Sequence, residues 1–380
     1  MPGRITAVVG IVASCLAYQS SSFNNQPPLT RVNRFSGGVS ALHATDLPDS
    51  WAQDTQTPII NRAIVEAGIM SSVEHVQTEL VQGEVGKKVK GVKVGGGGFG
   101  GGGGFREGNS GALAVKQKKV KGVKKTSGGK KISKEIETMG VARVNNVLSP
   151  STADKLLNFV NEEKLRCESL VKEGKEDPLH YFSNVLLSDS RCDLQLGLEE
   201  PLVLEALSEI LNDSVVGEVY DTIIGDGEGL VHELAALISD PGSKRQVVHP
   251  DVAFDSDSKI LTCFVSLQDI TRDMGPTVFL PGTMGKDAHD ALNDHSRRDD
   301  FLLATPSRIS LLNKGDCSVF DGRALHCGTA NESEGRRVLF YFSIRKGVVG
   351  SVNNPGSLRW DLRGKGLRLA DIKGGIDIKF

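Results

Sequence analysis

Three short segments of this chain carry residue types that could act together: His249-Pro250-Asp251, then His326, then Arg337 eleven residues later. Two imidazoles and one carboxylate can hold three adjacent positions on ferrous iron and leave the others open for a co-substrate and O2. A cation just beyond the second histidine could hold the far carboxylate of a bound keto acid. This order predicts an oxygenase that uses Fe(II), 2-oxoglutarate and O2.

The His-x-Asp tripeptide alone is a weak signal, because a chain with eight histidines contains one by chance about half the time. Its weight comes from the strands expected around it. A short β-prone run, 246–248, leads into the triplet, and 261–267 is a second run rich in β-formers. Residues 337–344 make the clearest strand of the chain. The candidate ligands are therefore expected on or beside β-strands.

Glycine- and proline-containing turns separate these runs, at 275–276, 281–282 and 314–316. Short strands between such turns predict an antiparallel sandwich or roll rather than alternating βαβ units. In a strand, residues two apart share a face, so His249 and Asp251 can point at one ion. Residues distant in sequence would then meet inside the roll.

Residues 234–346 resemble the phytanoyl-CoA dioxygenase family of the 2-oxoglutarate/Fe(II)-dependent oxygenases. The resemblance rests on the metal motif at 249–251, on the turn-strand-turn sequence GPTVFLPGT at 275–283, and on the stretch 315–337. It extends more weakly upstream to about Val141, and so covers a little over half of the chain.

The resemblance implies a mainly β fold with supporting helices, built on a double-stranded β-helix (jelly-roll) core. It implies that His249, Asp251 and His326 hold Fe(II) and form the catalytic centre, and that Arg337 binds the C5 carboxylate of 2-oxoglutarate. The implied reaction is hydroxylation of a small organic substrate, with decarboxylation of 2-oxoglutarate to succinate.

The roles of some neighbouring residues are not decided by the sequence. Arg336 adjoins Arg337, and either could bind the carboxylate; we favour Arg337, because it has the family spacing after the distal histidine. Thr329 and Ser343 are further candidates for hydroxyl contacts with the cofactor. The family often has a histidine where this chain has Met284, a departure that touches no metal ligand.

Two other classes of protein are compatible with these residues. One is a non-catalytic jelly-roll binding module, although a decayed site would usually lose at least one of the three ligands. The other is a cupin-like metalloenzyme that does not use 2-oxoglutarate. No CoA-binding signature is visible, and the sequence identifies no substrate beyond a small molecule.

Composition sets outer bounds on partners and redox chemistry. A net charge of −2 predicts no overall attraction to nucleic acid or to a membrane. The six cysteines show no CxxC pairing or zinc-like spacing, which indicates free thiols rather than a disulfide framework.

The first 45 residues are typical of a targeting presequence. An apolar run, 5–18, is too short to span a bilayer comfortably, and an acid-free stretch rich in Ser, Asn and Thr follows it. This pattern is similar to the bipartite presequences of proteins imported into complex plastids, so we expect organelle import. Secretion and a mitochondrial presequence are the alternatives. No transmembrane span is expected in the mature protein.

Four further segments are predicted after the presequence. Residues 46–85 form a helical segment, and 86–139 form a Gly/Lys-rich low-complexity linker, which cannot bury enough apolar surface to order itself. A basic arm that touches nucleic acid or an anionic membrane is the weaker reading of that linker, and no specific nucleic-acid partner is expected. Residues 140–347 form the dioxygenase domain, with a long polar insertion after Gly282, and 348–380 form a C-terminal tail.

Overall fold

The structure is a computed structural model. Its described residues all belong to one unit, 41–380. The described ranges are 127–183, 190–225, 227–255, 259–347 and 357–375. The predicted presequence, the helical segment 46–85 and most of the predicted linker lie outside these ranges.

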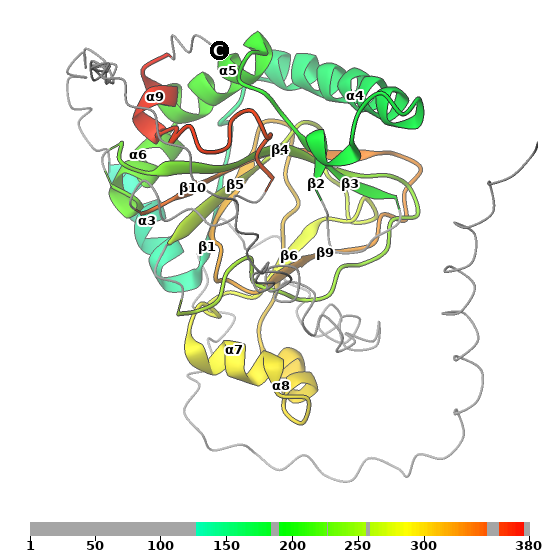
Figure 1. Cartoon of the computed structure of the whole chain (residues 1–380). Helices are drawn as coiled ribbons and strands as arrows, with labels where there is room; N and C mark the ends of the chain where they lie inside the picture. The colour runs from blue at the N-terminus through cyan, green and yellow to red at the C-terminus, as the bar shows by residue number, and fades with distance from the viewer. Residues whose placement is uncertain (1–126, 184–189, 226, 256–258, 348–356, 376–380) are drawn as a thin grey trace, which may run out of the picture. The chain divides into compact units, whose positions relative to one another are not determined.

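Two antiparallel sheets build the body of the protein (Figure 1). The larger has seven strands in the order β1-β8-β5-β10-β4-β3-β2, and the smaller has the order β7-β6-β9. The predicted mainly β, jelly-roll class is confirmed. The strands are β1 Val141–Val144, β2 Phe182–Ser183, β3 Arg191–Gln195, β4 Leu230–Ser239, β5 Ile260–Ser266, β6 Thr277–Phe279, β7 Arg308–Ile309, β8 Cys317–Asp321, β9 His326–Gly328 and β10 Arg337–Arg345.

Strand β10 lies at the centre of the large sheet and is buried on both faces. Val338, Phe340 and Phe342 pack into the core cluster shared with the helices. Leu339 and Tyr341, at the alternate positions, pack into a second cluster that includes Phe279 of the small sheet. The strand therefore separates a helical side from an interior side, which faces the small sheet.

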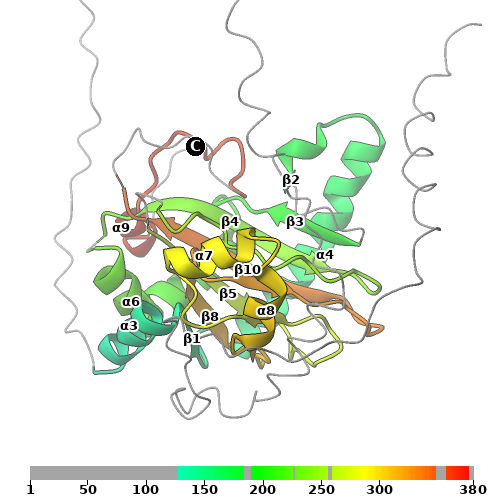
Figure 2. The ribbon, with the colours of Figure 1, turned by 90° about the horizontal axis from the view of Figure 1, so that it is seen from below.

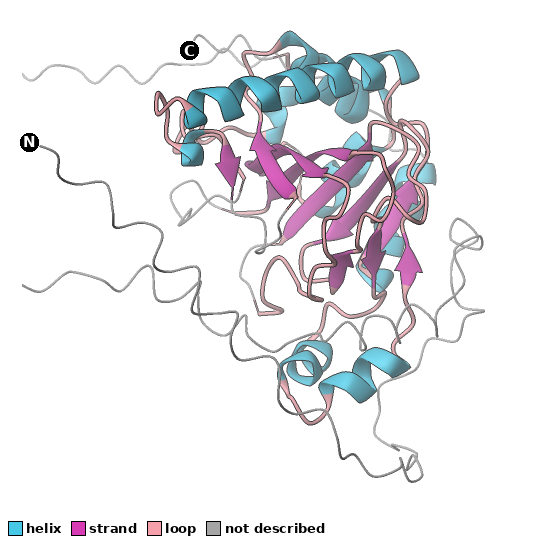
Figure 3. Ribbon diagram, turned by 90° about the vertical axis from the view of Figure 1, so that its right-hand side faces the viewer, coloured by secondary structure: helices cyan, strands magenta, loops and turns pink. Residues whose placement is uncertain are grey.

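Helices cover the outer face of the large sheet and are also found beside the small one (Figure 3). The outer group contains α3 Ser127–Met139, α4 Pro150–Lys172, α5 Pro201–Ser208, α6 Val216–Ile223 and α9 Leu369–Lys373. A short 3₁₀ helix at Pro178–His180 and a π-helical segment at Glu209–Asp213 lie between them in sequence. Helix α4 starts at Pro150, because Ser149 accepts a hydrogen bond from the Thr152 N–H at 3.1 Å and the proline ring suits the first turn.

The polar insertion after Gly282 folds into two helices, α7 (Lys286–Asn293) and α8 (Arg298–Ala304). Figure 2 shows them in front of the sheets when the protein is seen from below. Leu292 and Leu302 pack against Val278 of the small sheet in a third cluster. None of the described helices is both long and apolar enough to cross a membrane.

The structure differs from the predicted linker at its C-terminal end, where residues 127–139 form helix α3. Ile136 is 1% exposed there and joins the core on the helical side. Lysines and glycines dominate the composition of the segment, but its apolar side chains recur at helical spacing and form one buried face. The prediction of a linker rests on the Gly and Lys content, which does not register the spacing of the few apolar residues.

Shortening Ile136 to valine is expected to lower the free energy of unfolding by about 0.5–1.5 kcal/mol, because a buried methylene is lost from a packed core. Urea denaturation would measure it. The matched control is Ile132→Val on the same helix, where the side chain is only partly buried. A smaller loss of unfolding free energy is expected for Ile132→Val. If both variants lost an equally negligible amount, the packing of Ile136 in the core would be contradicted.

The predicted C-terminal tail also takes part in the core. Leu358, Leu362, Leu369 and Ile372 are buried in the cluster on the helical side. The Leu369 N–H donates to the Gly229 carbonyl at 2.8 Å, which ties α9 to the start of β4. The folded domain therefore extends well beyond residue 347, since these four leucine and isoleucine side chains all pack on the helical side.

Candidate active site

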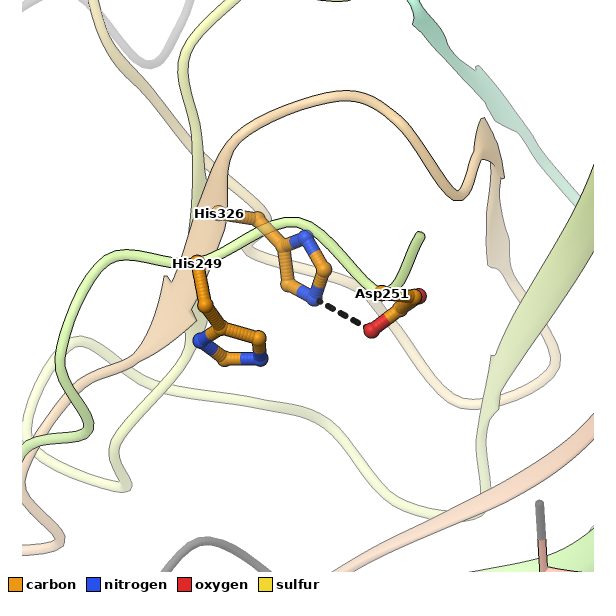
Figure 4. Close-up of side chains that lie close together, drawn as sticks. All are labelled: His249, Asp251 and His326. Atoms are coloured by element: carbon orange, nitrogen blue, oxygen red, sulfur yellow. Dashed lines mark ion pairs between the residues drawn. The ribbon is translucent and has the colours of Figure 1, made fainter. Parts of the chain in front are cut away.

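Backbone pairing brings the three predicted metal ligands together (Figure 4). His249 and His326 form an isolated antiparallel bridge, with N–H to carbonyl distances of 3.0 and 2.9 Å. The Asp251 N–H donates to the Gly322 carbonyl at 2.7 Å. One potential ligand atom from each side chain lies within 4.8 Å of the others. This set of two imidazoles and a carboxylate suits non-haem Fe(II).

The hydrogen bonds of the two histidines fix which nitrogen is free. His249 Nδ1 lies 2.8 Å from the Val247 carbonyl, and His326 Nδ1 lies 3.0 Å from the Ala324 carbonyl. A carbonyl can only accept, so each Nδ1 carries the proton and each Nε2 keeps its lone pair. His326 Nε2 lies 3.5 Å from Asp251 Oδ1. Both rings therefore present a ligand nitrogen to the same space.

Burial sets the charge state of this cluster. It lowers the pKa of His249 to about 4, with the neighbouring His326 adding to the effect, and it lowers the pKa of His326 to about 4. Both imidazoles are neutral at physiological pH, as metal ligands must be. Desolvation also raises the pKa of Asp251 to about 7, although 32% of its side chain remains accessible. A divalent cation among the three would favour the ionised carboxylate.

Arg337 lies on the interior side of β10 and is 0% exposed. Its Nη1 donates to the Gly275 carbonyl and its Nη2 to Ser239 Oγ at 3.0 Å, while Nε has no partner in the described part of the chain. Burial lowers the pKa of Arg337 to about 9, so the guanidinium is still charged at neutral pH. A buried cation with an unused donor is suited to an anionic ligand.

Arg336 points the other way, as alternation along a strand requires. Its Nε donates to Asp240 Oδ1 at 2.5 Å and its Nη1 to Asn161 Oδ1 at 2.8 Å. Asn161 belongs to α4 on the helical side. Of the two adjacent arginines, Arg337 is the one on the interior side.

Arg191 of β3 is a second buried arginine, which sequence reasoning missed. It pairs in register with Ser239 of β4, which in turn pairs with Arg337 of β10. Its Nη2 donates to the carbonyls of Lys244 and Thr329 at 3.1 and 3.0 Å, while Nε and Nη1 have no partner among the described residues. The charge of Arg191 also lowers the pKa of Arg337. We name Arg191 and Arg337 the anion pocket, because both guanidiniums are buried and have spare donors that suit an anionic ligand.

A glycine leaves room for this second arginine. A Cβ added to Gly328, two residues after His326, would lie 2.5 Å from Arg191 Nη1 and 2.7 Å from Gln246 Oε1. Any side chain at 328 would therefore displace the guanidinium. The close approach places Arg191 beside the strand that carries the distal histidine.

The two predicted hydroxyl residues lie in different surroundings. Thr329 Oγ1 donates to the Pro276 carbonyl at 2.8 Å, and the Thr329 carbonyl accepts from Arg191. Ser343 Oγ donates to Glu233 and lies 3.1 Å from Thr262 Oγ1. Thr329 is thus near Arg191, one of the two buried arginines. Ser343 lies six residues along β10 from Arg337, and its hydroxyl is hydrogen-bonded to the Glu233 carboxylate.

Known proteins resemble this chain over the same region. The model of the phytanoyl-CoA dioxygenase family (PhyH) matches residues 136–339. An uncharacterized protein of Saccharomyces cerevisiae is 25% identical over 268 residues, which cover 64% of this chain and 72% of that protein.

Two solved structures of enzymes from nogalamycin biosynthesis are also similar. The epimerase SnoN, in complex with Fe3+, alpha ketoglutarate and nogalamycin RO, is 16% identical, with a TM-score of 0.42 over 61% of this chain and 95% of its own. The carbocyclase SnoK, described as non-haem and alpha ketoglutarate dependent, is 18% identical, with a TM-score of 0.44 over 61% of this chain and 89% of its own.

The family match spans more than half of the chain, from the end of α3 into β10. It includes all three candidate ligands and Arg337, the residues on which the resemblance in the sequence rested. The cofactors expected from the sequence, Fe(II) and 2-oxoglutarate, are those of this family, and the donor set described above fits them. The chain therefore belongs to the phytanoyl-CoA dioxygenase family.

Proposed function

We propose that this protein is an Fe(II)- and 2-oxoglutarate-dependent oxygenase that hydroxylates a small organic molecule and releases succinate and CO2. The observation that carries the proposal is the joint placement of two features: the His249, Asp251 and His326 cluster, and the buried arginines Arg191 and Arg337. The cluster suits iron, and the arginines suit the far carboxylate of a keto acid.

Each residue has a distinct task in this proposal. His249 and His326 would bind iron through Nε2, and Asp251 through a carboxylate oxygen. Arg337 would bind the C5 carboxylate of 2-oxoglutarate, with Arg191 offering further N–H donors to the same ligand. Bound iron would supply the activation of O2 and the oxidation of the substrate.

Aromatic side chains would keep water out of the site. Phe320 and Phe279 lie 5.0 and 5.7 Å from the His326 ring, measured between ring centroids. Phe264 lies 5.0 Å from Phe320 in an edge-on contact. Such an apolar wall favours the neutral imidazoles and limits side reactions of a reactive oxidant with solvent.

Anaerobic titration of the full chain with Fe(II) and then 2-oxoglutarate tests this proposal. We expect a visible metal-to-keto-acid charge-transfer band in the wild type and its loss in His249→Ala, because one of three protein ligands is removed. The control is His180→Ala, a half-buried histidine outside the metal cluster that pairs with Glu176 at 3.0 Å and should leave the band unchanged.

The outcome also separates the alternative classes. An iron-loaded protein that shows no band with 2-oxoglutarate would point to a cupin-like metalloenzyme without a keto-acid co-substrate. A folded protein that binds no metal would point to a non-catalytic binding module.

A further inference from the structure

A second group of polar side chains lies on the interior face of the large sheet, next to the anion pocket. Asp193 and Gln195 follow Arg191 at alternate positions of β3, so the three share one face. Asp193 and Gln195 are each 4% exposed. Glu233 extends the group from β4 and is half-buried. We name Asp193, Gln195 and Glu233 the acidic subsite.

Two buried acceptors of the acidic subsite have no partner in the part of the chain that the structure describes. One is Asp193 Oδ1; Asp193 Oδ2 accepts hydrogen bonds from Tyr341 Oη at 2.7 Å and from Ser357 Oγ. Gln195 Nε2 donates to Ser183 Oγ at 2.8 Å, but Gln195 Oε1 has no partner among the described residues. Buried polar atoms are nearly always paired, so both oxygens indicate a ligand that brings donors.

Glu233 completes the acidic subsite on β4. Its carboxylate accepts from Ser343 Oγ and, at 3.4 Å, from the Ser357 N–H.

Ring contacts lead from Asp193 to a metal ligand: Tyr341, which donates to Asp193, lies 5.4 Å from Phe264 between ring centroids. Phe264 lies 5.0 Å from Phe320, which in turn lies 5.0 Å from the His326 ring. A ligand that contacts the acidic subsite would therefore lie on the same interior side as the candidate iron site.

Arg191 and Arg337 both lie at one end of the interior face, where strands β3, β4 and β10 are in register, and both are assigned to the keto acid. The carboxylates of Asp193 and Glu233 lie further along β3 and β4, where their hydrogen-bond partners within the described part of the chain are three hydroxyls and the Ser357 N–H, all of them neutral. A hydroxyl ligand would pair the free oxygens but leave the negative charge. An ammonium group would supply up to three N–H donors and offset the charge as well.

We propose that the acidic subsite binds a protonated amine of the substrate, and so selects cationic amines as the substrate class. The apolar side chains of the interior cluster, among them Phe264 and Leu237, would contact the carbon skeleton next to that amine. The substrate role rests on the proposed oxygenase function. Binding of the amine itself does not, because no residue of the acidic subsite is a metal ligand.

Binding of n-butylammonium and of the neutral 1-butanol to the full chain tests the inference, with calorimetry or ligand-observed NMR as the readout. We expect the ammonium to bind at least about tenfold more tightly than the alcohol, because its hydrogen bonds to carboxylates are charge-assisted. Asp193→Asn and Glu233→Gln should each remove most of this preference.

The control is Glu334→Gln, an exposed glutamate outside the acidic subsite, which should bind both probes as the wild type does. Circular dichroism checks the fold of each variant, and half-buried Glu233 provides a test even where Asp193→Asn does not fold. Equal binding of the two probes by the wild type, or an unchanged preference in the folded variants, would overturn the inference.

Comparison with the charge-transfer titration keeps the two proposals separate. If the protein binds the ammonium selectively but shows no charge-transfer band, the acidic subsite is supported and the proposed oxygenase function is rejected. If the band is normal but the ammonium is not preferred, the oxygenase function is supported and the proposed amine-binding role of the acidic subsite is rejected.

Discussion

Replacing Arg337 with alanine is expected to weaken 2-oxoglutarate binding to the iron-loaded protein by roughly 100- to 1,000-fold. Arg337 is fully buried, and its Nε, which has no partner within the described ranges, is available to a ligand. Without it, the C5 carboxylate would be buried with one of its two cationic partners missing. Arg337→Lys should recover part of the affinity, because an ammonium restores the charge but not the planar, forked geometry. Anaerobic titration of the charge-transfer band measures each affinity.

Arg336→Ala is the matched control, since it removes the same side chain from the adjacent position. Arg336 contacts Asp240 and Asn161 on the helical side, so its loss should lower stability and leave 2-oxoglutarate affinity nearly unchanged. Arg191→Ala should have an effect between those of the two neighbouring arginines, because Nε and Nη1 of Arg191 have no partner among the described residues and could donate to the same carboxylate. A larger loss of affinity in Arg336→Ala than in Arg337→Ala would reverse the assignment.

The candidate metal ligands could be predicted from the sequence because their chemistry is local. His249 and Asp251 share a tripeptide, and Arg337 follows His326 at a characteristic interval. Alternation along β10 also distinguishes Arg337 from Arg336, once a strand is assigned there. The pairing of the two histidines across the small sheet could not be predicted, because it depends on strand register over a long sequence separation.

The anion pocket and the acidic subsite lie outside the motifs that carry the family resemblance. In sequence, Arg191, Asp193 and Gln195 alternate with Cys192 and Leu194, a pattern typical of a strand with one face in water. In the structure the polar face is the interior one. Only the second sheet, packed on that face, turns an ordinary amphipathic strand into a set of buried ligand contacts.

Asp193 is expected to make the stability of the folded protein depend strongly on pH. Burial raises its pKa to about 7, and the hydrogen bonds from Ser357 and Tyr341 offset only part of that rise. An unfolded aspartate titrates near about 3.9. Between these two values the folded state keeps a proton that the unfolded state has lost, so stability falls as the pH rises. The loss through this one group reaches up to about 4 kcal/mol at and above neutral pH.

Asp193→Asn isolates this contribution, because the amide has nearly the same shape and is neutral at every pH. Urea unfolding should give the variant a growing advantage over the wild type from about pH 4 to about pH 7, and a constant one above that. Glu334→Gln, at an exposed position, should show no such trend. A stability difference between Asp193→Asn and the wild type that is the same at acidic and at alkaline pH would contradict the buried, protonated carboxyl.

A bound cation would offset the loss of folding free energy that the ionised Asp193 causes. n-Butylammonium should therefore raise the melting temperature of the wild type more at about pH 8, where the carboxylate is charged, than at about pH 5. In Asp193→Asn, where no charge forms, the increase should be small at both pH values. An increase that is independent of pH, or equal in the variant, would place the bound cation away from Asp193. The pH dependence of unfolding and the pH dependence of ammonium binding therefore both report on the charge of the Asp193 carboxylate.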